Sequence, residues 1–368
     1  MNEIKYFLSV IPKLGILNLF SVFIYRVKCR IGYYLYKYPV VPFIEKGPMF
    51  KKNKIKNYQK ISSESIAETI KNAENISQGS FQYFSNNYYY LGSPPNWFLD
   101  PINNNKITNT NIHWSKLSEF SEEVIDIKII WEPSRFDWAI VLAKAYNITG
   151  ESKYIDSLNQ YIKKWQKKNP VNQGPNWKCG QETSIRLMQL LLSRFILGQH
   201  LIYSEPIVEF VREHCKRINS TISYAMAQNN NHGTSEAAAL YIGGALLFNL
   251  PGIDKKLKNN AIRWHTRGKA FLENRVKKLI LTDGSFSQYS TNYHRVLLDT
   301  LNIVEFWRQK LDLKPFSVKY YSKVNLAVKW LFQIINPVNG NVSNMGGNDG
   351  ARLFVISNTK YRDYRSTV

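Results

Sequence analysis

From Trp131 onward the sequence repeats one pattern, in which an amphipathic helical stretch is followed by a short polar connection. Between Tyr154 and Trp165 the apolar residues recur at i, i+1, i+4, i+7, i+8 and i+11, which is the stripe of a helix that buries one face. Similar stripes cover residues 185–196, 207–222, 237–247, 262–279, 296–311 and 324–335. Because strand-like alternation is absent from this part, the sequence predicts packed helices.

The helical stretches recur in pairs. Starts near residues 135, 182, 234 and 294 are followed by second helices near 152, 206, 262 and 322, so a hairpin repeats about every 50 residues. Such hairpins can stack into a curved or closed (α/α) barrel. The stretch AAALYIGGALL (237–247) is apolar on all sides, which suits a buried inner helix. The predicted fold is all-α, an incomplete (α/α) toroid of helical hairpins.

Three parts of the chain can be separated. Residues 1–130 are expected to form N-terminal helices, one of them near 62–75, and loops that wrap the toroid. The stretch 88–106 is predicted to be a loop because its prolines interrupt a helix. Residues 131–336 are the predicted toroid and catalytic domain. Residues 337–368 are rich in Gly, Asn and Asp and contain RLFVIS, a plausible strand, so they are expected to begin a β-sandwich that is truncated or absent.

The end signals of the first toroid helix are clear. In EPSRFDWAIVLAKAYNITG, Ser134 is a candidate N-cap with Asp137 three residues later, and Gly150 is expected to end the helix.

The first 30 residues are apolar enough to suggest a targeting segment. However, charges and a proline interrupt the run, no cleavage site follows, and residues 14–25 are too few to span a bilayer. They are expected to form packing helices, with a membrane-surface anchor as the alternative.

The net charge narrows the choice of partners. The chain has 49 Lys and Arg against 27 Asp and Glu, a formal charge of +22. A field of this sign attracts polyanions such as nucleic acid, anionic lipid or acidic polysaccharide, although lysine-rich stretches are also typical of solvated faces. The three cysteines are too widely spaced for a disulfide framework or a zinc site, so each is interpreted as a packing residue.

Two polar stretches stand at predicted helix starts. In QNNNHGTSEAAALY, Asn229 to Gly233 offer uncharged amides beside His232, where a helix N-terminus favours an anion; an ordinary Asn-rich cap is the alternative. In STNYHR, extending the buried stripe of the next helix backwards reaches Tyr293 and His294, which would make a credible acid/base pair if both face inward. Completion of the core is the alternative for this pair.

Two further stretches carry tryptophan beside charged residues. In GPNWKCGQETSIRL, Trp177 offers a flat face suited to a sugar ring, and Glu182 with Arg186 form an i, i+4 pair. In IIWEPSRFDW, Trp131 and Arg135 stand at a helix mouth in the same way. Structural roles for the charged residues are equally open.

Taken jointly, five ordered motifs resemble the heparinase II/III-like polysaccharide lyases. They are KIIWEPSRF, NWKCGQETSIRL, NNNHGTSEAAALY, STNYHR and GGNDGARLF, and the resemblance runs from about Ile127 to Asp363. It implies an N-terminal (α/α) toroid, a C-terminal antiparallel β-sandwich, and cleavage of an acidic polysaccharide by β-elimination. Asn231 matches the carboxylate-neutralising asparagine and Tyr293 the catalytic tyrosine.

The remaining expected site residues follow from that scheme. His232 and His294 are candidate catalytic partners of Tyr293, with no fixed role carried over. The expected substrate-binding residues are Trp131, Arg135, Trp177, Glu182, Arg186, Glu236, Tyr289 and Arg295. The family's sandwich ordinarily contributes a further histidine and a metal site, so no metal or cofactor is expected within this sequence. A fragment and a bare toroid with an open cleft are both compatible with it.

The expected partner is an acidic polysaccharide, and nucleic acid is not expected. The lyase class favours the periplasm or cell envelope, while the lack of a visible signal peptide leaves the cytoplasm open.

Two other functions are compatible with the sequence. A glycoside hydrolase needs a carboxyl pair, for which Glu182, Glu236 and Asp283 are available without a specified arrangement. A non-catalytic protein that binds a polyanion or capsular polysaccharide is the second.

Overall fold

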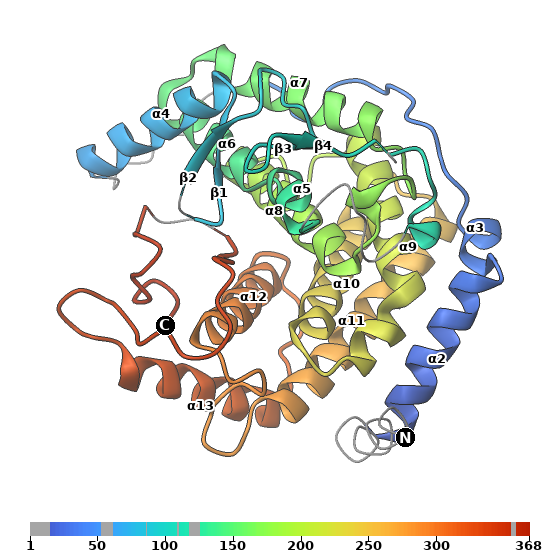
Figure 1. The fold of residues 1–368 in the computed structure, drawn as a ribbon, viewed down its shortest axis with the longest axis vertical. Coiled ribbons are helices and arrows are strands. Elements are labelled where there is room, and N and C mark those ends of the chain that lie inside the picture. The colour runs from blue at the N-terminus through green and yellow to red at the C-terminus, as the bar shows by residue number, and fades with distance from the viewer. Residues whose placement is uncertain (1–14, 53–61, 86, 109, 118–125, 355–357) are drawn as a thin grey trace.

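The computed structural model describes residues 15–52, 62–85, 87–108, 110–117, 126–354 and 358–368, and α-helices dominate it (Figure 1). From Asp137 the helices form consecutive hairpins. They are α6 (Asp137–Thr149) with α7 (Ser152–Lys168), α8 (Gly180–Ile196) with α9 (Glu205–Ala227), α10 (Asn231–Asn249) with α11 (Lys255–Leu279), and α12 (Thr291–Lys310) with α13 (Val318–Ile334). Each starts within two helical turns of its predicted start, so the predicted hairpin repeat is confirmed.

The hairpins follow one another around a ring (Figure 1). Helix α10 packs against α8, α9, α11 and α12, and α8 packs in turn against α6. Helix α4 (Ser63–Ser77), expected near 62–75, packs against α6 and α7 and extends the ring before the first hairpin. The ring stays open between α4 and the α12–α13 hairpin, which confirms the predicted incomplete helical toroid.

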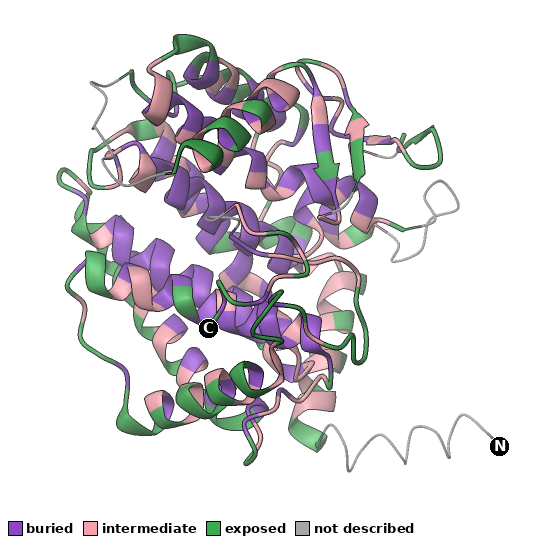
Figure 2. Cartoon of the chain, turned by 90° about the vertical axis from the view of Figure 1, so that its left-hand side faces the viewer, coloured by how far each residue is buried: buried purple, intermediate pink, exposed green. Residues whose placement is uncertain are grey.

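Helix α10 is the centre of the core, as its apolar composition predicted. Nearly all of its residues are buried, whereas the peripheral helices bury only one face (Figure 2). Two glycines allow α10 and α11 to approach closely. A Cβ at Gly244 would lie 2.6 Å from the Ala261 carbonyl oxygen, and one at Gly268 would lie 2.5 Å from the Tyr241 backbone nitrogen. The close approach therefore requires both glycines, which outweighs their cost to the helix.

The start of α6 differs from the expectation. Ser134 is not its N-cap; it lies in the 3-10 turn η2 (Glu132–Arg135), which follows α5 (Lys128–Trp131). Its hydroxyl accepts a hydrogen bond from the indole of Trp165 at 2.9 Å. The residue that precedes α6 is Phe136, in a left-handed conformation with φ of 68°. The expected stop is confirmed, because Gly150 takes φ of 75° and donates to Tyr146.

The stretch 88–106 is not the continuous loop that was predicted. It contains parts of two short antiparallel hairpins, in which β1 (Ser80–Tyr83) pairs with β2 (Asn87–Tyr90) and β3 (Leu99–Asp100) pairs with β4 (Asn105–Lys106). The prolines lie between these strands, so they interrupt helix formation as argued but leave the flanking residues free to pair. A 3-10 turn, η1 (Trp114–Lys116), follows them.

The N-terminal helices lie on the outside of the ring. Helix α2 (Ile16–Arg30) is followed by the short α3 (Tyr33–Lys37) and packs against α9, where Tyr25 stacks on Tyr224 with ring centroids 3.9 Å apart. Its other face exposes Ile16, Leu17, Phe20 and Phe23. Residues 1–14 of the expected packing segment lie outside the described residues. Over the part of the chain that is described, no helix has the length and apolarity to cross a membrane.

The C-terminal segment packs onto the toroid and bridges the open side of the ring (Figure 1). The Asn358 side chain donates to the Ser65 carbonyl of α4 at 2.8 Å, and the Thr291 N–H at the start of α12 donates to the Met345 carbonyl at 3.1 Å. Leu353 and Tyr364 are buried. The predicted strand RLFVIS is wrong for residues 352–354, which form no strand; 355–357 lie outside the described residues.

Candidate active site

Several elements begin or end at one side of the ring and surround a small cavity. The first turns of α8, α10 and α12, the α5–η2 segment and the C-terminal segment all contribute to it, and its volume is about 80 Å³. The predicted site residues that line it are Trp131, Arg135, Glu182, Asn231, His232 and Tyr293. Residues more than 150 positions apart in the sequence therefore meet at one place, as a shared active site requires.

The three asparagines at the start of α10, Asn229, Asn230 and Asn231, make different contacts. Asn229, with φ of 53°, accepts a hydrogen bond from Arg275 at 3.1 Å, and Asn230 is the N-cap that accepts from the His232 N–H at 3.0 Å. The Asn231 N–H donates to the Gln288 side chain at 2.9 Å. Its carboxamide faces the cavity without a hydrogen-bond partner among the described residues. Cap and ligand site were weighed as alternatives, and the run contains features of both.

His232 follows Asn231 and is partly exposed to the cavity. Its Nδ1 lies 3.9 Å from the Cys179 Sγ, and its Nε2 has no hydrogen-bond partner among the residues described. Burial lowers the pKa of His232 to about 4, with Glu182 opposing the shift. The imidazole is therefore neutral at neutral pH and able to accept a proton.

Tyr293 approaches the cavity from the first turn of α12. Ser290 caps this helix by accepting from the Tyr293 N–H at 3.1 Å, which holds the ring near the cavity wall. The phenol donates to Asp349 Oδ2 at 2.9 Å. Burial and the nearby carboxylate of Asp349 raise the pKa of Tyr293 well above its usual value. The phenol is therefore protonated at neutral pH and can act as a proton donor.

Asp349 and Lys128 complete this side of the cavity, and neither was predicted as a site residue. The Lys128 Nζ lies 3.5 Å from Asp349 Oδ2. Burial favours the neutral form of Asp349, but the Tyr293 hydrogen bond and the Lys128 charge outweigh it and lower the pKa. The available signal was the motif GGNDGARLF, in which Asp349 is the single acid. Its contact with Tyr293 depends on how the C-terminal segment folds back.

Arg135 lines the cavity but is already engaged. It forms a bidentate pair with Glu182 at 2.7 and 2.9 Å and a third bond to Glu132 at 2.6 Å. Burial raises the pKa of Glu132 to about 7, although Arg135 opposes the shift. The expected role of Arg135 in holding a substrate acid is therefore not supported by its position. Glu182 acts in this arrangement as its partner.

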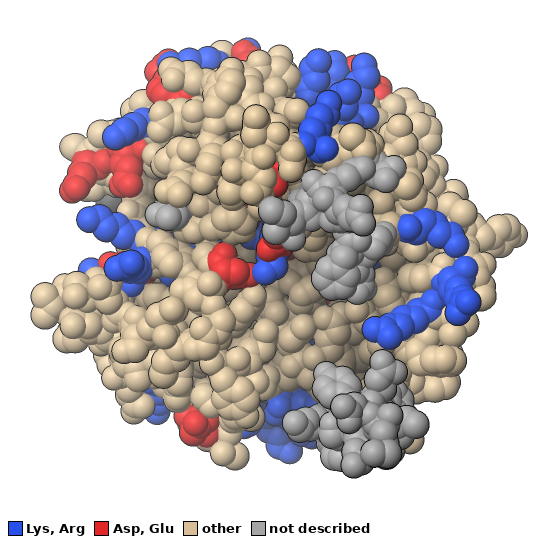
Figure 3. Space-filling view, in the orientation of Figure 1, with Lys and Arg blue, Asp and Glu red and all other residues tan. Residues whose placement is uncertain are grey.

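The wall of the cavity does not carry an excess of positive charge. Around it, Lys128 and Arg135 face the carboxyl groups of Glu132, Glu182 and Asp349. Acidic and basic groups lie side by side near the centre of this face of the molecule (Figure 3). An acidic substrate would consequently be held here by neutral donors such as the Asn231 carboxamide rather than by a cluster of cations.

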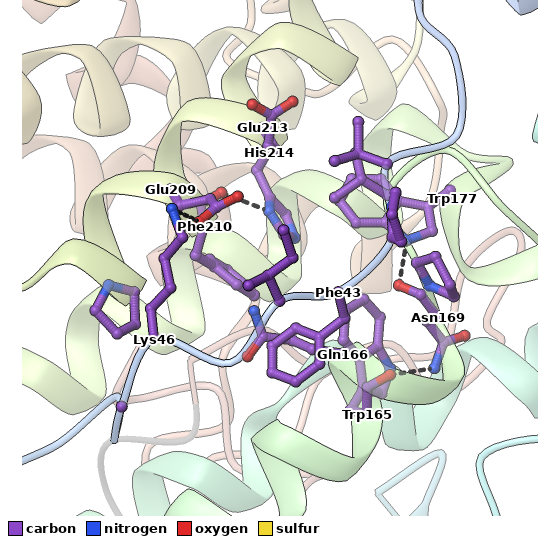
Figure 4. Close-up of a pocket in the computed structure, with 17 residues that line it drawn as sticks. Phe43, Lys46, Trp165, Gln166, Asn169, Trp177, Glu209, Phe210, Glu213 and His214 are labelled. Atoms are coloured by element: carbon purple, nitrogen blue, oxygen red, sulfur yellow. Dashed lines mark hydrogen bonds and ion pairs between the residues drawn. The ribbon is translucent and has the colours of Figure 1, made fainter.

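Trp177 and Arg186 lie in the core and not on a sugar path. Trp177 is 1% exposed, and its indole donates to the Asn169 carbonyl at 3.1 Å (Figure 4). The Arg186 guanidinium lies 4.3 Å from the Trp165 ring and donates to His214 at 3.1 Å. The expected contacts of both residues with substrate are therefore wrong. Trp131 does line the cavity, where its indole donates to Pro175 at 2.9 Å.

His294 and Arg295 also point away from the cavity. Consecutive helical residues are rotated by about 100°, so the helix that turns Tyr293 inward turns its neighbours elsewhere. His294 is fully buried, stacks on Trp330 and lies 2.9 Å from the Ala327 carbonyl oxygen through its Nε2. Arg295 lies 4.3 Å from the rings of Tyr361 and Tyr364, so it anchors the C-terminal segment. His294 does face inward, but into the core beside Trp330, so the alternative of core completion applies to it and its expected pairing with Tyr293 is not supported. The expected substrate contact of Arg295 is wrong.

Glu236 and Tyr289 were both expected to bind substrate, but Glu236 is buried away from the cavity and Tyr289 is exposed outside it. Glu236 is buried so tightly that a Cβ at Gly180 would lie 2.5 Å from its carboxyl group, and burial raises its pKa to about 8. It does not line the cavity. Tyr289 is 73% exposed and follows Gln288, the residue that accepts from the Asn231 N–H. Tyr289 therefore lies on the surface close to the site, where its role stays a prediction.

No cluster of metal-ligating side chains is present in the described part of the chain, and the expectation that no cofactor is bound stays a prediction. Within that part, no group of three or more His, Cys, Asp or Glu side chains is arranged to hold a metal ion. Cys29, Cys179 and Cys215 are free thiols.

Comparison with known proteins gives a family. The profile described as Heparinase II/III N-terminus matches residues 47–363. A heparin-sulfate lyase of Bacteroides thetaiotaomicron is 29% identical over 165 residues, covering 44% of this chain and 22% of that protein. One from Pedobacter heparinus is 21% identical over 257 residues, covering 68% of this chain and 34% of that protein. The matches thus span about a third or less of these relatives.

Solved structures share the fold. A heparan sulfate lyase from Pedobacter heparinus superposes with a TM-score of 0.50 at 20% identity, over 86% of this chain and 44% of that one. A structure of heparinase III gives a TM-score of 0.53 at 17% identity, over 86% of this chain and 46% of that one. At these identities the likeness concerns the helical architecture alone.

Proposed function

The chain belongs to the heparinase II/III family, and we propose on that premise that it carries the helical catalytic domain of a lyase that cleaves a uronate-containing polysaccharide by β-elimination. One observation supports this most directly. Asn231, His232 and Tyr293, from the first turns of two separate hairpins, line the same cavity. A neutral amide, a neutral imidazole and a protonated phenol are the groups that such an elimination needs.

The amide would stabilise the charge that forms on the substrate. When a uronate loses its C5 proton, negative charge builds on the carboxyl oxygens, and fixed donors aimed at them lower the barrier. The N–H groups of Asn231 and His232 are already bonded to Gln288 and Asn230. These two N–H groups are therefore engaged, and the Asn231 carboxamide is the donor that we assign to the substrate. Help from the N–H groups that follow them, at the helix start near residue 234, stays a prediction.

The two proton-transfer groups are distinguished by their pKa values. His232 has a pKa of about 4, so its neutral Nε2 would take the C5 proton. The electron pair of that bond forms the C4–C5 double bond, and the C4–O bond breaks. Tyr293, whose pKa lies above the usual value, would give its proton to the departing C4 oxygen. Asp349 then loses its donor, and Lys128 remains beside it.

The assignment of His232 as base has a consequence for pH. Because the neutral imidazole is the active form and burial lowers its pKa to about 4, kcat/KM should stay high through the range in which an ordinary histidine becomes protonated. The acidic limb of the profile should then fall near pH 4. Initial rates measured across this range, with separate control of folding by circular dichroism, test it. A limb centred near the ordinary pKa of histidine would contradict the assignment.

The reaction itself is tested by supplying a panel of uronate polymers, including heparan sulfate and alginate, and following ultraviolet absorbance. Elimination creates an unsaturated uronate that absorbs, whereas hydrolysis releases reducing ends without that absorbance. We expect absorbance to rise in parallel with reducing ends for at least one polymer. Reducing ends without absorbance would show a hydrolase. If both signals are absent for every polymer, the proposal of catalysis is contradicted.

The hydrolase alternative is not favoured by the positions of its candidate carboxyl groups. Glu182 is paired with Arg135, and Glu236 is buried behind Gly180. Asp283 lies in the turn before α12, where it accepts from the Ser285 N–H at 2.9 Å, and it does not line the cavity. These groups do not form a pair that flanks a bond.

Contact with a membrane surface stays a prediction, supported by the apolar residues that α2 exposes.

A further inference from the structure

A second, larger depression lies next to the catalytic cavity. It has a volume of about 1140 Å³, compared with about 80 Å³ for the cavity. Binding sites for small molecules range over roughly 300–1,000 Å³. The cavity by itself is therefore smaller than an ordinary ligand site, while the depression is large enough for several sugar units. We call it the tail groove, because residues 339–348 and 360–365 of the C-terminal segment form most of its wall, and Phe84 and Ser85 contribute the rest.

The tail groove is linked to the catalytic residues at two points. Asn348 lines it and precedes Asp349, the acceptor of the Tyr293 hydroxyl. Phe84 also lines it, and its N–H donates to Glu132 at 2.9 Å, the carboxylate that also holds Arg135. A polymer bound in the groove would therefore lie beside the residues that surround the cavity.

The chemistry of the groove complements an acidic sugar chain. Lys360 and Arg362 are exposed and have no ion-pair partner among the described residues, while Arg365 is paired with Asp363 at 2.7 Å. The lining thus has three cations and one anion. Asn341 adds an exposed side-chain amide, and Tyr361 lines the groove with its hydroxyl donating to Asn348 at 2.6 Å. Amides, an aromatic ring and unpaired cations are together suited to acidic carbohydrate.

The cations predicted for this role are unavailable. Arg135 is held by two carboxylates, Arg186 is in the core, and Arg295 anchors the tail. On the basis of the proposed function, we infer that the tail groove is an anionic-saccharide subsite, in which Lys360 and Arg362 bind carboxylate or sulfate groups of the sugars beside the one that is cleaved. Substrate affinity thereby resides in a region separate from the neutral chemistry at Asn231.

The test measures binding without turnover. In a Tyr293→Phe background, Lys360→Ala with Arg362→Ala is compared with Lys256→Ala with Arg263→Ala, a matched exposed pair on α11 that removes the same charge away from the groove. The probes are hexasaccharides of heparan sulfate and of alginate, with neutral maltohexaose as a reference. Calorimetry gives the dissociation constants at several salt concentrations, and thermal unfolding checks that both pairs fold.

We expect the groove pair to weaken binding of an acidic hexasaccharide about tenfold, since two exposed charge contacts are lost. The slope of log affinity against log salt should fall by about one to two for the same reason. The α11 pair should have less than a twofold effect, and an acidic disaccharide, too short to reach the groove, should not distinguish the two pairs. Preference for heparan sulfate over alginate would identify sulfate as the bound group, and equal affinity would identify carboxylate.

Different outcomes separate the two proposals. If the unmutated chain cleaves a uronate polymer but both charge pairs bind the hexasaccharides alike, the groove assignment is wrong and the proposed function stands. If the groove pair weakens binding selectively but no polymer is cleaved, the subsite stands and the lyase reaction is wrong. If no acidic hexasaccharide binds at all, both are wrong.

Discussion

Replacing Asn231 by alanine is expected to lower turnover by about 10²–10³-fold, the usual cost of removing one donor that stabilises a developing oxyanion. The effect on the melting temperature should be small. The carboxamide has no hydrogen-bond partner among the described residues, and the Asn231 N–H that binds Gln288 is unaffected by the substitution. Turnover is measured from product absorbance, and stability from thermal unfolding.

The neighbouring asparagine provides a matched control. Asn230 caps α10 through the His232 N–H, and its change to alanine should cost about 1 kcal/mol of stability, as the loss of an N-cap does. Its activity per folded molecule should fall much less than that of Asn231→Ala. If Asn231→Ala instead loses stability and keeps its activity per folded molecule, Asn231 is an ordinary capping residue.

Tyr293→Phe is expected to reduce turnover by about 10²–10⁴-fold while substrate binding is retained. The substitution removes one oxygen and leaves the ring, which packs at the start of α12. It deletes the proposed donor to the C4 oxygen and the hydrogen bond to Asp349. Asp349 keeps Lys128 at 3.5 Å, so the carboxylate is not left without a charged neighbour. The measurements are kcat on the best polymer of the panel and a dissociation constant by calorimetry.

The control is a tyrosine that is buried away from the cavity. Tyr241 lies on α10, and its hydroxyl has no hydrogen-bond partner among the described residues, so Tyr241→Phe should leave both turnover and binding unchanged. Retained turnover in Tyr293→Phe would exclude the phenol as proton donor. Binding without turnover in the unmutated chain would instead favour the alternative of a polyanion-binding protein.

The helices of this protein could be found from local pattern alone. Apolar stripes located the hairpins, and the all-apolar stretch 237–247 identified the buried helix α10, because a helix must bury whichever face its sequence makes apolar. Helix starts were less certain: α11 begins at Lys255, well before its apolar stripe at 262, because Asp254 caps it there. Strand pairing in 80–106 was missed because the short pairs show too few alternating residues to be recognised.

The residues of the candidate site could be predicted only in part from the sequence. The five motifs and their resemblance to the lyase family selected Asn231 and Tyr293, with His232 as a candidate partner, and the fold brings the three residues to one cavity. Exposure was predicted poorly. Trp177 and Arg186 have the composition of a sugar-binding surface, yet they pack on Trp165 in the core. An aromatic ring beside a charge has the same sequence pattern in both settings.

Local periodicity was thus enough to locate the toroid helices and the hairpin repeat, since each helix depends on residues three or four positions apart. Long-range packing decided which polar groups are free to react. Arg135 became unavailable through Glu182, Tyr293 gained Asp349, and Lys360 and Arg362 came to line a groove beside the cavity. The pKa and availability of a side chain depend on neighbours that are distant in the sequence, and only the folded chain brings those neighbours together.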